Sequence, residues 1–305
     1  MTAEIKSPLL RLLIYGHVWL ALGAAAQVWW MCEVLGTRPW MPMLFAFTAT
    51  FSGYGWMRLM RMNVTELAGS PQMAWSRAHG KALWGSVVVS GCVAAVALCD
   101  LLPGIHPLFW VASGSAAFYV LPSFSGAKEV FGLRRVPLLK SFVIAFAWAA
   151  MTVLIAKAGE WYQPKGMLVI WLLLAQFCFF LAIAIVFDIR DTAFDLASIR
   201  SVPQVIGERW TRRIAVLLMV LPISMWGRSA FIRSMIDAHR DYASGLNPAP
   251  WIFLLVTMGY VTAAVLLGRR SRAGPVFHGI VLDGLLMLVP LLAWLGRLLG
   301  SGGYF

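Results

Sequence analysis

Apolar runs of about 20 residues, separated by short clusters of charge, dominate this chain of 305 residues. A helix of ~20 apolar residues matches the hydrocarbon thickness of a bilayer and satisfies its own backbone hydrogen bonds there. Only 12% of the residues are charged, whereas a soluble domain carries ~25%. The sequence therefore predicts an all-α integral membrane protein, with residues 1–305 forming a single transmembrane domain and almost no soluble part.

About nine segments fit a transmembrane helix. They are residues 9–33, 39–60, 82–102, 106–122, 137–157, 166–187, 212–232, 249–267 and 277–299. The first is expected to be a retained helix, because it is long and lacks the small-residue pattern of a cleavage site. Fifteen Trp and seven Tyr, many near segment ends, are typical of anchors at the membrane interface.

Lys and Arg are distributed unevenly between the two sides of this arrangement. With the N-terminus inside, 18 of the 25 basic residues lie on the cytoplasmic side and 7 on the other. Positive charge favours the cytoplasmic side. We therefore expect a cytoplasmic N-terminus and an external C-terminus, in a bacterial inner membrane. The net charge of +12 is then mainly a topology signal, and nucleic-acid binding is not expected because no basic soluble module presents the charge.

Three of the thirteen acidic residues lie together at the cytoplasmic end of the sixth segment. Offsets of three and four place Asp188, Asp191 and Asp195 on one helix face, where like charges repel unless a cation lies among them. Carboxylate oxygens suit Mg²⁺, which commonly bridges carboxylates to substrate phosphates. The spacing favours a magnesium–diphosphate site at the membrane edge. The alternative is a solvated helix end, paired with the neighbouring arginines.

The residues around these aspartates resemble the second aspartate-rich motif of the UbiA superfamily of intramembrane prenyltransferases. The family pattern is D-x-x-D-x-x-x-D, followed by a basic turn and Leu-Gly; here the aspartates are followed by Arg200-Ser-Val-Pro203 and Ile206-Gly207. Upstream, Tyr119 and the basic stretch from Arg134 to Lys140 resemble the family's segment between helices 4 and 5. The resemblance covers most of the chain and implies a ring of helices around a central cavity.

That resemblance implies an enzyme that transfers a prenyl group from a prenyl diphosphate to a hydrophobic acceptor, such as an aromatic quinone precursor. Asp188, Asp191 and Asp195 would hold Mg²⁺ as the cofactor. The cationic groups would neutralise the departing diphosphate, and aromatic rings such as Tyr119 and Trp56 would face the allylic carbocation. The expected catalytic residues are Lys140, Arg58 and Tyr119, and the residues expected to bind the diphosphate are Arg61, Arg134 and Arg200.

The first motif of the family is degenerate in this chain. Relatives carry N-x-x-x-D-x-x-x-D, or in a smaller branch Y-N-x-D-R, at the end of the second helix. The chain has Tyr54-Gly55-Trp56-Met57-Arg58, so Gly55 and Met57 replace the expected oxygen ligands. Arg58 and Arg61 either contact the diphosphate directly or anchor the helix at the interface. A non-catalytic UbiA-fold protein, acting as a complex subunit or as a lipid or quinone binder, therefore stands beside the enzyme as a second hypothesis.

Overall fold

The structure is a computed structural model that describes residues 5–62, 71–120, 139–159, 166–192, 201–240 and 277–300, together with Gly259 and Thr262. Within these ranges it is helical and contains no strand. The helices are α1 (Pro8–Tyr15), α2 (Val18–Leu35), α3 (Trp40–Arg61), α4 (Pro71–Ala78), α5 (Gly80–Leu101), α6 (Pro107–Val120), α7 (Leu139–Ala158), α8 (Gly166–Asp191), α9 (Val202–Ile206), α10 (Glu208–Arg240) and α12 (Asp283–Gly300).

A helix lies at each expected transmembrane segment except 249–267, which falls outside the described residues apart from Gly259 and Thr262. Four helices in the described ranges, namely α2, α5 with its extension to Gly104, α7 and α8, are long and apolar enough to cross a membrane. The protein is thus an all-helical integral membrane protein. The full count of nine membrane helices stays a prediction.

The first expected segment is divided into two helices. His17 adopts a left-handed backbone conformation with φ of 59°, which ends α1, and its carbonyl then accepts the first hydrogen bond of α2, from Ala21. A left-handed residue other than glycine costs about 1–2 kcal/mol. The prediction of a single helix over 9–33 is therefore wrong. An apolar run does not reveal that one residue within it adopts a left-handed conformation.

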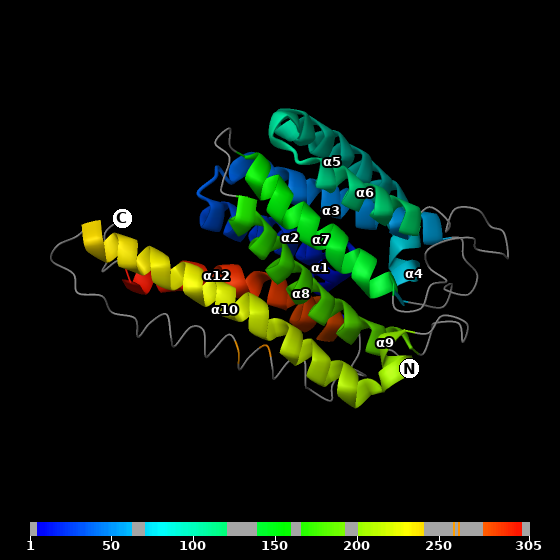
Figure 1. The fold of residues 1–305 in the computed structure, drawn as a ribbon. Helices are drawn as coiled ribbons and strands as arrows, with labels where there is room; N and C mark the ends of the chain where they lie inside the picture. The colour runs from blue at the N-terminus through cyan, green and yellow to red at the C-terminus, as the bar shows by residue number, and fades with distance from the viewer. Residues whose placement is uncertain are drawn as a thin grey trace.

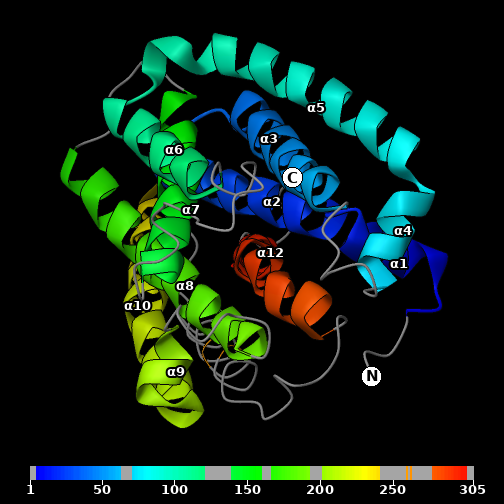
Figure 2. The ribbon, with the colours of Figure 1, turned by 90° about the vertical axis from the view of Figure 1, so that its right-hand side faces the viewer.

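The helices pack in layers (Figures 1 and 2). α3 packs against α2 and α5, α7 packs against α2, α6 and α8, and α10 packs against α8. Figure 2 shows α5 as the outermost helix beyond α3, while α12 lies inside the arc of the others and packs against α2. The main core cluster is rich in alanine, especially in α7. Small residues allow membrane helices to approach closely.

A proline in α12 creates a backbone carbonyl that another helix satisfies. Pro290 has no N–H to donate to the carbonyl of Leu286, four residues earlier. Gln27 of α2 supplies the missing donor, with its Nε2 2.7 Å from the Leu286 oxygen. Gln176 of α8 donates in turn to Gln27 Oε1 at 3.2 Å. Both glutamines are fully buried, so this amide chain links three helices in the interior.

Contacts along α3, α7 and α8 fix which ends of these helices lie together. Thr50 of α3 contacts Met151 of α7, and one turn later Tyr54 contacts Trp148. Trp148 also contacts Phe180 of α8. α7 therefore runs antiparallel to both neighbours, and its N-terminal end meets the C-terminal ends of α3 and α8. The short helices α4 and α9 lie at this same end (Figure 1), which we call the polar end.

Candidate functional site

The polar end contains an enclosed ion pair between α7 and α8. Lys140, in the first turn of α7, lies with its Nζ 3.1 Å from Oδ1 of Asp188, in the last turn of α8. Ser141 donates its hydroxyl hydrogen to Oδ2 of the same carboxylate. Asp188 is only 2% exposed and Ser141 only 1%. Both carboxylate oxygens of Asp188 therefore have a partner within the bundle.

Burial explains why this pair holds together. An isolated carboxylate in an apolar interior is costly, and it is retained there when it is paired and hydrogen-bonded. The side chain of Lys140 remains 21% exposed, so its aliphatic stem packs in the bundle while the ammonium lies near the surface. Removing one partner of a buried ion pair typically costs about 3–5 kcal/mol, because the other charge is left without compensation.

A second polar cluster holds Arg58 at the same end. One guanidinium nitrogen of Arg58 lies 3.0 Å from His17 Nε2, and the other donates to Gln72 Oε1 at 3.3 Å. Arginine only donates, so His17 Nε2 is the acceptor, and the imidazole is neutral with its hydrogen on Nδ1. The contact connects the left-handed turn between α1 and α2 with α3 and α4. Arg58 is thus a positioned side chain and is not a free interfacial anchor.

Aromatic rings lie beneath the two polar clusters. His17, Tyr54, Trp148 and Phe180 form successive ring contacts with centroid separations of 5.5, 6.5 and 5.2 Å. Trp148 is eight residues from Lys140, which places it roughly 12 Å along α7 from the ion pair. Trp56 points elsewhere: its ring packs edge-on against Trp84 of α5, with centroids 5.4 Å apart. Tyr54 and Trp148 therefore connect α3 to α7, whereas Trp56 connects α3 to α5. The cation-facing role of Trp56 stays a prediction.

Gly55 has a steric role that its place in the degenerate motif conceals. A Cβ atom built on Gly55 would lie 2.4 Å from Cγ2 of Val87 in α5. Val87 is itself buried, with Leu59 and Leu83 in the same apolar cluster. The glycine therefore permits close contact between α3 and α5. An asparagine cannot occupy position 55 unless the Val87 side chain or one of these helices moves.

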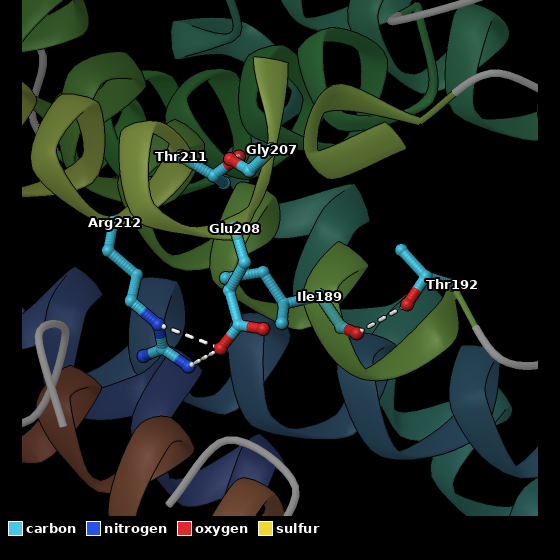
Figure 3. Close-up of polar contacts among 6 residues, drawn as sticks. All are labelled: Ile189, Thr192, Gly207, Glu208, Thr211 and Arg212. Carbon is cyan, nitrogen blue, oxygen red and sulfur yellow. Dashed lines mark hydrogen bonds and ion pairs between the residues drawn. The ribbon is translucent and has the colours of Figure 1, made fainter. Parts of the chain in front are cut away.

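The turn that follows the aspartate motif is built from α9 and the start of α10 (Figure 3). Gly207 has φ of 81°, a conformation that favours glycine, and its carbonyl accepts the hydroxyl hydrogen of Thr211. Arg212 donates through two nitrogens to Oε1 of Glu208, at 3.2 and 2.8 Å. Figure 3 shows this pair beside the last turn of α8, where Thr192 donates to the Ile189 carbonyl.

Ser201 is the N-cap residue of α9. Its backbone N–H donates to Gln204 Oε1 at 2.9 Å. Its side chain is buried and faces the backbone N–H of Gln204, so the two residues form a capping box at the start of α9.

The structure brings together some of the site residues predicted from the sequence. Lys140 and Asp188 are in direct contact, and Arg58 lies at the same end. Three more lie in the terminal turns of described helices, although their side chains are not described; these are Tyr119 of α6, Arg61 of α3 and Asp191 of α8. Arg134, Asp195 and Arg200 lie outside the described residues.

Sequence reasoning missed several residues of the site. Ser141 follows the predicted Lys140 and could have been found as the next polar residue at the start of an apolar run. The pairing of His17 with Arg58 joins two distant segments, so it requires the tertiary fold. Gln72 and Trp148 gave no signal, because one lies in a short amphipathic helix and the other in a uniformly apolar run.

The metal site expected from the aspartate motif stays a prediction, because Asp195 lies outside the described residues and the side chain of Asp191 is not described. No three His, Cys, Asp or Glu side chains in the described part lie close enough to share an ion. α3 offers Gly55 and Met57 where oxygen ligands are expected. Asp188 already contacts the ammonium of Lys140. Two positive unit charges ~4 Å apart repel by about 4 kcal/mol at an effective dielectric constant of 20. A divalent ion beside Asp188 would be repelled by the ammonium about twice as strongly.

The model of the UbiA prenyltransferase family matches residues 70–255 of the chain, more than half of its length. The chain belongs to the UbiA prenyltransferase family. Comparison with curated protein sequences finds no significant match. The resemblance drawn from the aspartate motif and its flanks is thus confirmed at the level of the family.

Solved structures of UbiA homologues share the fold. An apo homologue from Aeropyrum pernix K1 aligns over 93% of this chain and 98% of its own, with a TM-score of 0.59 and 10% identity. A homologue from Archaeoglobus fulgidus bound to DMAPP and Mg²⁺ aligns over 95% and 99%, with a TM-score of 0.54 and 14% identity. The complex of an Archaeoglobus fulgidus homologue with GPP and Mg²⁺ aligns over 94% of this chain and 98% of its own, with a TM-score of 0.54 and 13% identity. At such low identity these likenesses establish the fold and leave activity to the site itself.

Proposed function

We propose that this UbiA family member binds a prenyl diphosphate with the diphosphate at the polar end, and transfers the prenyl group to a hydrophobic acceptor. The observation that carries the proposal is the enclosed contact of Lys140 and Ser141 with Asp188, the first residue of the family's second aspartate motif. The Archaeoglobus homologue binds DMAPP and GPP, which are ligands of this class. The orientation in a bacterial inner membrane is part of the same proposal.

The residues of the polar end supply the chemistry that such a transfer needs. The bond between the allylic carbon and the diphosphate oxygen breaks, the diphosphate leaves with the electron pair, and the acceptor nucleophile forms the new bond to carbon. Lys140 and Arg58 stabilise the negative charge that develops on the leaving group, which is usually a large catalytic contribution. The rings of Tyr54 and Trp148, which contact each other in the interior, would face the allylic cation.

The other residues expected from the sequence keep their proposed roles. Arg61, Arg134 and Arg200 would contact the diphosphate, and Tyr119 would lie beside the prenyl chain in the central cavity implied by the family. If the diphosphate binds together with Mg²⁺, Asp191 and Asp195 are the carboxylates left to hold the ion, because Asp188 is paired with Lys140. Such an ion would bridge carboxylates to diphosphate oxygens.

A non-catalytic binder is the second candidate, and a specific observation favours it. α3 presents Gly55 and Met57 in place of the family's oxygen ligands, and Gly55 packs closely on Val87. A chain that has lost half of its motif can retain ligand binding without turnover. The two functions differ in one measurable product, inorganic diphosphate.

Geranyl diphosphate binding to the purified protein in lipid nanodiscs tests the proposal, with geraniol as the matched control without diphosphate. We expect binding of the diphosphate and much weaker binding of the alcohol. Release of inorganic diphosphate after addition of aromatic acceptors would favour the transferase, and binding without release would favour the non-catalytic protein. Equal binding of geraniol and geranyl diphosphate, or no binding of either, would contradict the proposal.

A further inference from the structure

Asp188 is the first aspartate of the family's second motif and is buried in this structure. In the family pattern this position is a metal ligand, yet here its two oxygens face an ammonium and a hydroxyl. We infer that Lys140 takes the place of a metal ion at Asp188, so that the diphosphate is bound through cationic side chains and not through Mg²⁺. The inference rests on the proposed ligand class and names what recognises its anionic end.

The geometry of the pair is that of a resident counter-ion. Lys140 Nζ lies 3.1 Å from Asp188 Oδ1, and the carboxylate is almost completely buried. Ser141 fixes the orientation of the carboxylate by donating to Oδ2. A carboxylate held in this way is already neutralised and hydrogen-bonded. A divalent ion would have to displace the ammonium or accept its repulsion at close range.

The other half of the expected metal site is closed sterically as well as chemically. Gly55 has no side chain, and the space that its Cβ would need is occupied by Val87 Cγ2 at 2.4 Å. Close packing of α3 on α5 at this position is therefore part of the fold. The helix that carries the first motif in relatives here carries a cation instead, Arg58, one turn after Tyr54 and oriented by His17 and Gln72.

Two cationic side chains on two helices thus lie at the end where relatives place metal ions. An arginine presents a planar fork that matches phosphate oxygens, and a lysine presents a point charge that phosphate groups also bind well. The side chain of Lys140 is 21% exposed and so is partly open to its surroundings at the polar end. A diphosphate arriving there competes with Asp188 for Lys140, so the carboxylate opposes binding in this chain.

Because of this competition, Asp188→Asn should not lower the affinity for the diphosphate. The same substitution at a metal ligand would lower it. If Asp188 held Mg²⁺, the substitution would abolish metal-dependent binding. If Asp188 instead holds Lys140, the substitution releases the ammonium toward the diphosphate, and affinity stays the same or rises up to about tenfold, because a hydrogen bond between charged groups is worth about that factor. Asp100→Asn, an exposed carboxylate at the far end of α5, is the matched control.

Isothermal titration of geranyl diphosphate into the nanodisc-embedded protein measures these effects, once with EDTA and once with excess Mg²⁺. For the unchanged protein we expect dissociation constants that agree within about threefold in the two buffers, a difference below 1 kcal/mol. Lys140→Met should weaken binding about 10- to 100-fold in both buffers. Lys157→Met, at the other end of the same helix, should change it little.

The outcomes separate the inference from the proposed function. Binding that requires Mg²⁺ and is lost in Asp188→Asn would overturn the inference and leave the proposed function standing. Absence of binding in both buffers would overturn both. If Lys140→Met does not fold because Asp188 is left unpaired, Lys140→Met combined with Asp188→Asn restores neutrality. The comparison of EDTA with Mg²⁺ and the Asp188→Asn result remain decisive without it.

Discussion

Gly55→Ala adds one methyl group at the place where α3 touches α5. The new Cβ would lie 2.4 Å from Val87 Cγ2, whereas carbon atoms in contact prefer separations of ~3.5–4.0 Å. The neighbours must therefore part by about 1 Å. Overpacking of this kind typically costs about 1–3 kcal/mol, which outweighs the gain of up to ~1 kcal/mol expected when alanine replaces glycine within a helix.

Gly53→Ala is the matched control on the same helix, because a Cβ at Gly53 meets nothing within 4 Å. We expect Gly53→Ala to be neutral or stabilising by up to ~1 kcal/mol, and Gly55→Ala to lower the free energy of unfolding. The assay is reversible unfolding by SDS in mixed micelles, followed by circular dichroism. In a Val87→Ala background the clash disappears, and Gly55→Ala should then resemble Gly53→Ala.

Equal effects of the two alanine substitutions, or a cost at Gly55 that Val87→Ala does not relieve, would refute the steric reasoning.

The result also bears on restoration of the family motif. Gly55→Asn with Met57→Asp should fail to create a metal site while Val87 is present, because the larger side chain meets the same methyl group. With Val87 reduced to alanine, the same pair of substitutions can be tested for metal binding on an unstrained helix.

Three further outcomes follow from named contacts and from the sequence. Gln27→Leu should cost about 1–2 kcal/mol of unfolding free energy, because the Leu286 carbonyl loses its donor; in a Pro290→Ala background, where a backbone N–H returns, the cost should fall, and an unchanged cost would argue against the exchange of donors. Arg58→Ala should weaken geranyl diphosphate binding by about 1.5–3 kcal/mol, and Arg38→Ala at the opposite end of α3 should not. A cysteine introduced at Ser198 in a cysteine-free protein should react with an impermeant thiol reagent only after permeabilisation, since labelling of intact cells would reverse the predicted topology.

Much of the helical framework could be predicted from the sequence, because apolar length reports directly on membrane helices. The helix boundaries at α3 and α8 fall within a few residues of the predicted segments. The family assignment rested on Asp188, Asp191 and Asp195 with their flanks; Asp188 and Asp191 lie on α8, and Asp195 falls outside the described residues. Such features are local, so spacing along one helix is enough to find them.

Other features depend on contacts between distant segments and could not be predicted. Lys140 and Asp188 are 48 residues apart, and nothing in either run indicates that one neutralises the other. Gly55 read as a lost ligand, whereas its packing on Val87 gives the physical reason why a larger residue does not fit there. The amide chain was partly predictable: Pro290 implies an unsatisfied carbonyl at Leu286, and Gln27 is a polar residue within an apolar run.

The amide chain through Gln27 also has a consequence for the order in which this protein matures. α12 follows α2 and α8 in the chain, so it enters the membrane after the helices that carry Gln27 and Gln176. Until α12 docks, the Leu286 carbonyl faces hydrocarbon without a donor, a state that favours continued movement or partial unwinding of the helix. After insertion, α12 must still pack against α2 before the Leu286 carbonyl gains its hydrogen-bond donor. Loss of Gln27 in α2 would therefore disturb α12, a helix made much later, by leaving the Leu286 carbonyl without its donor.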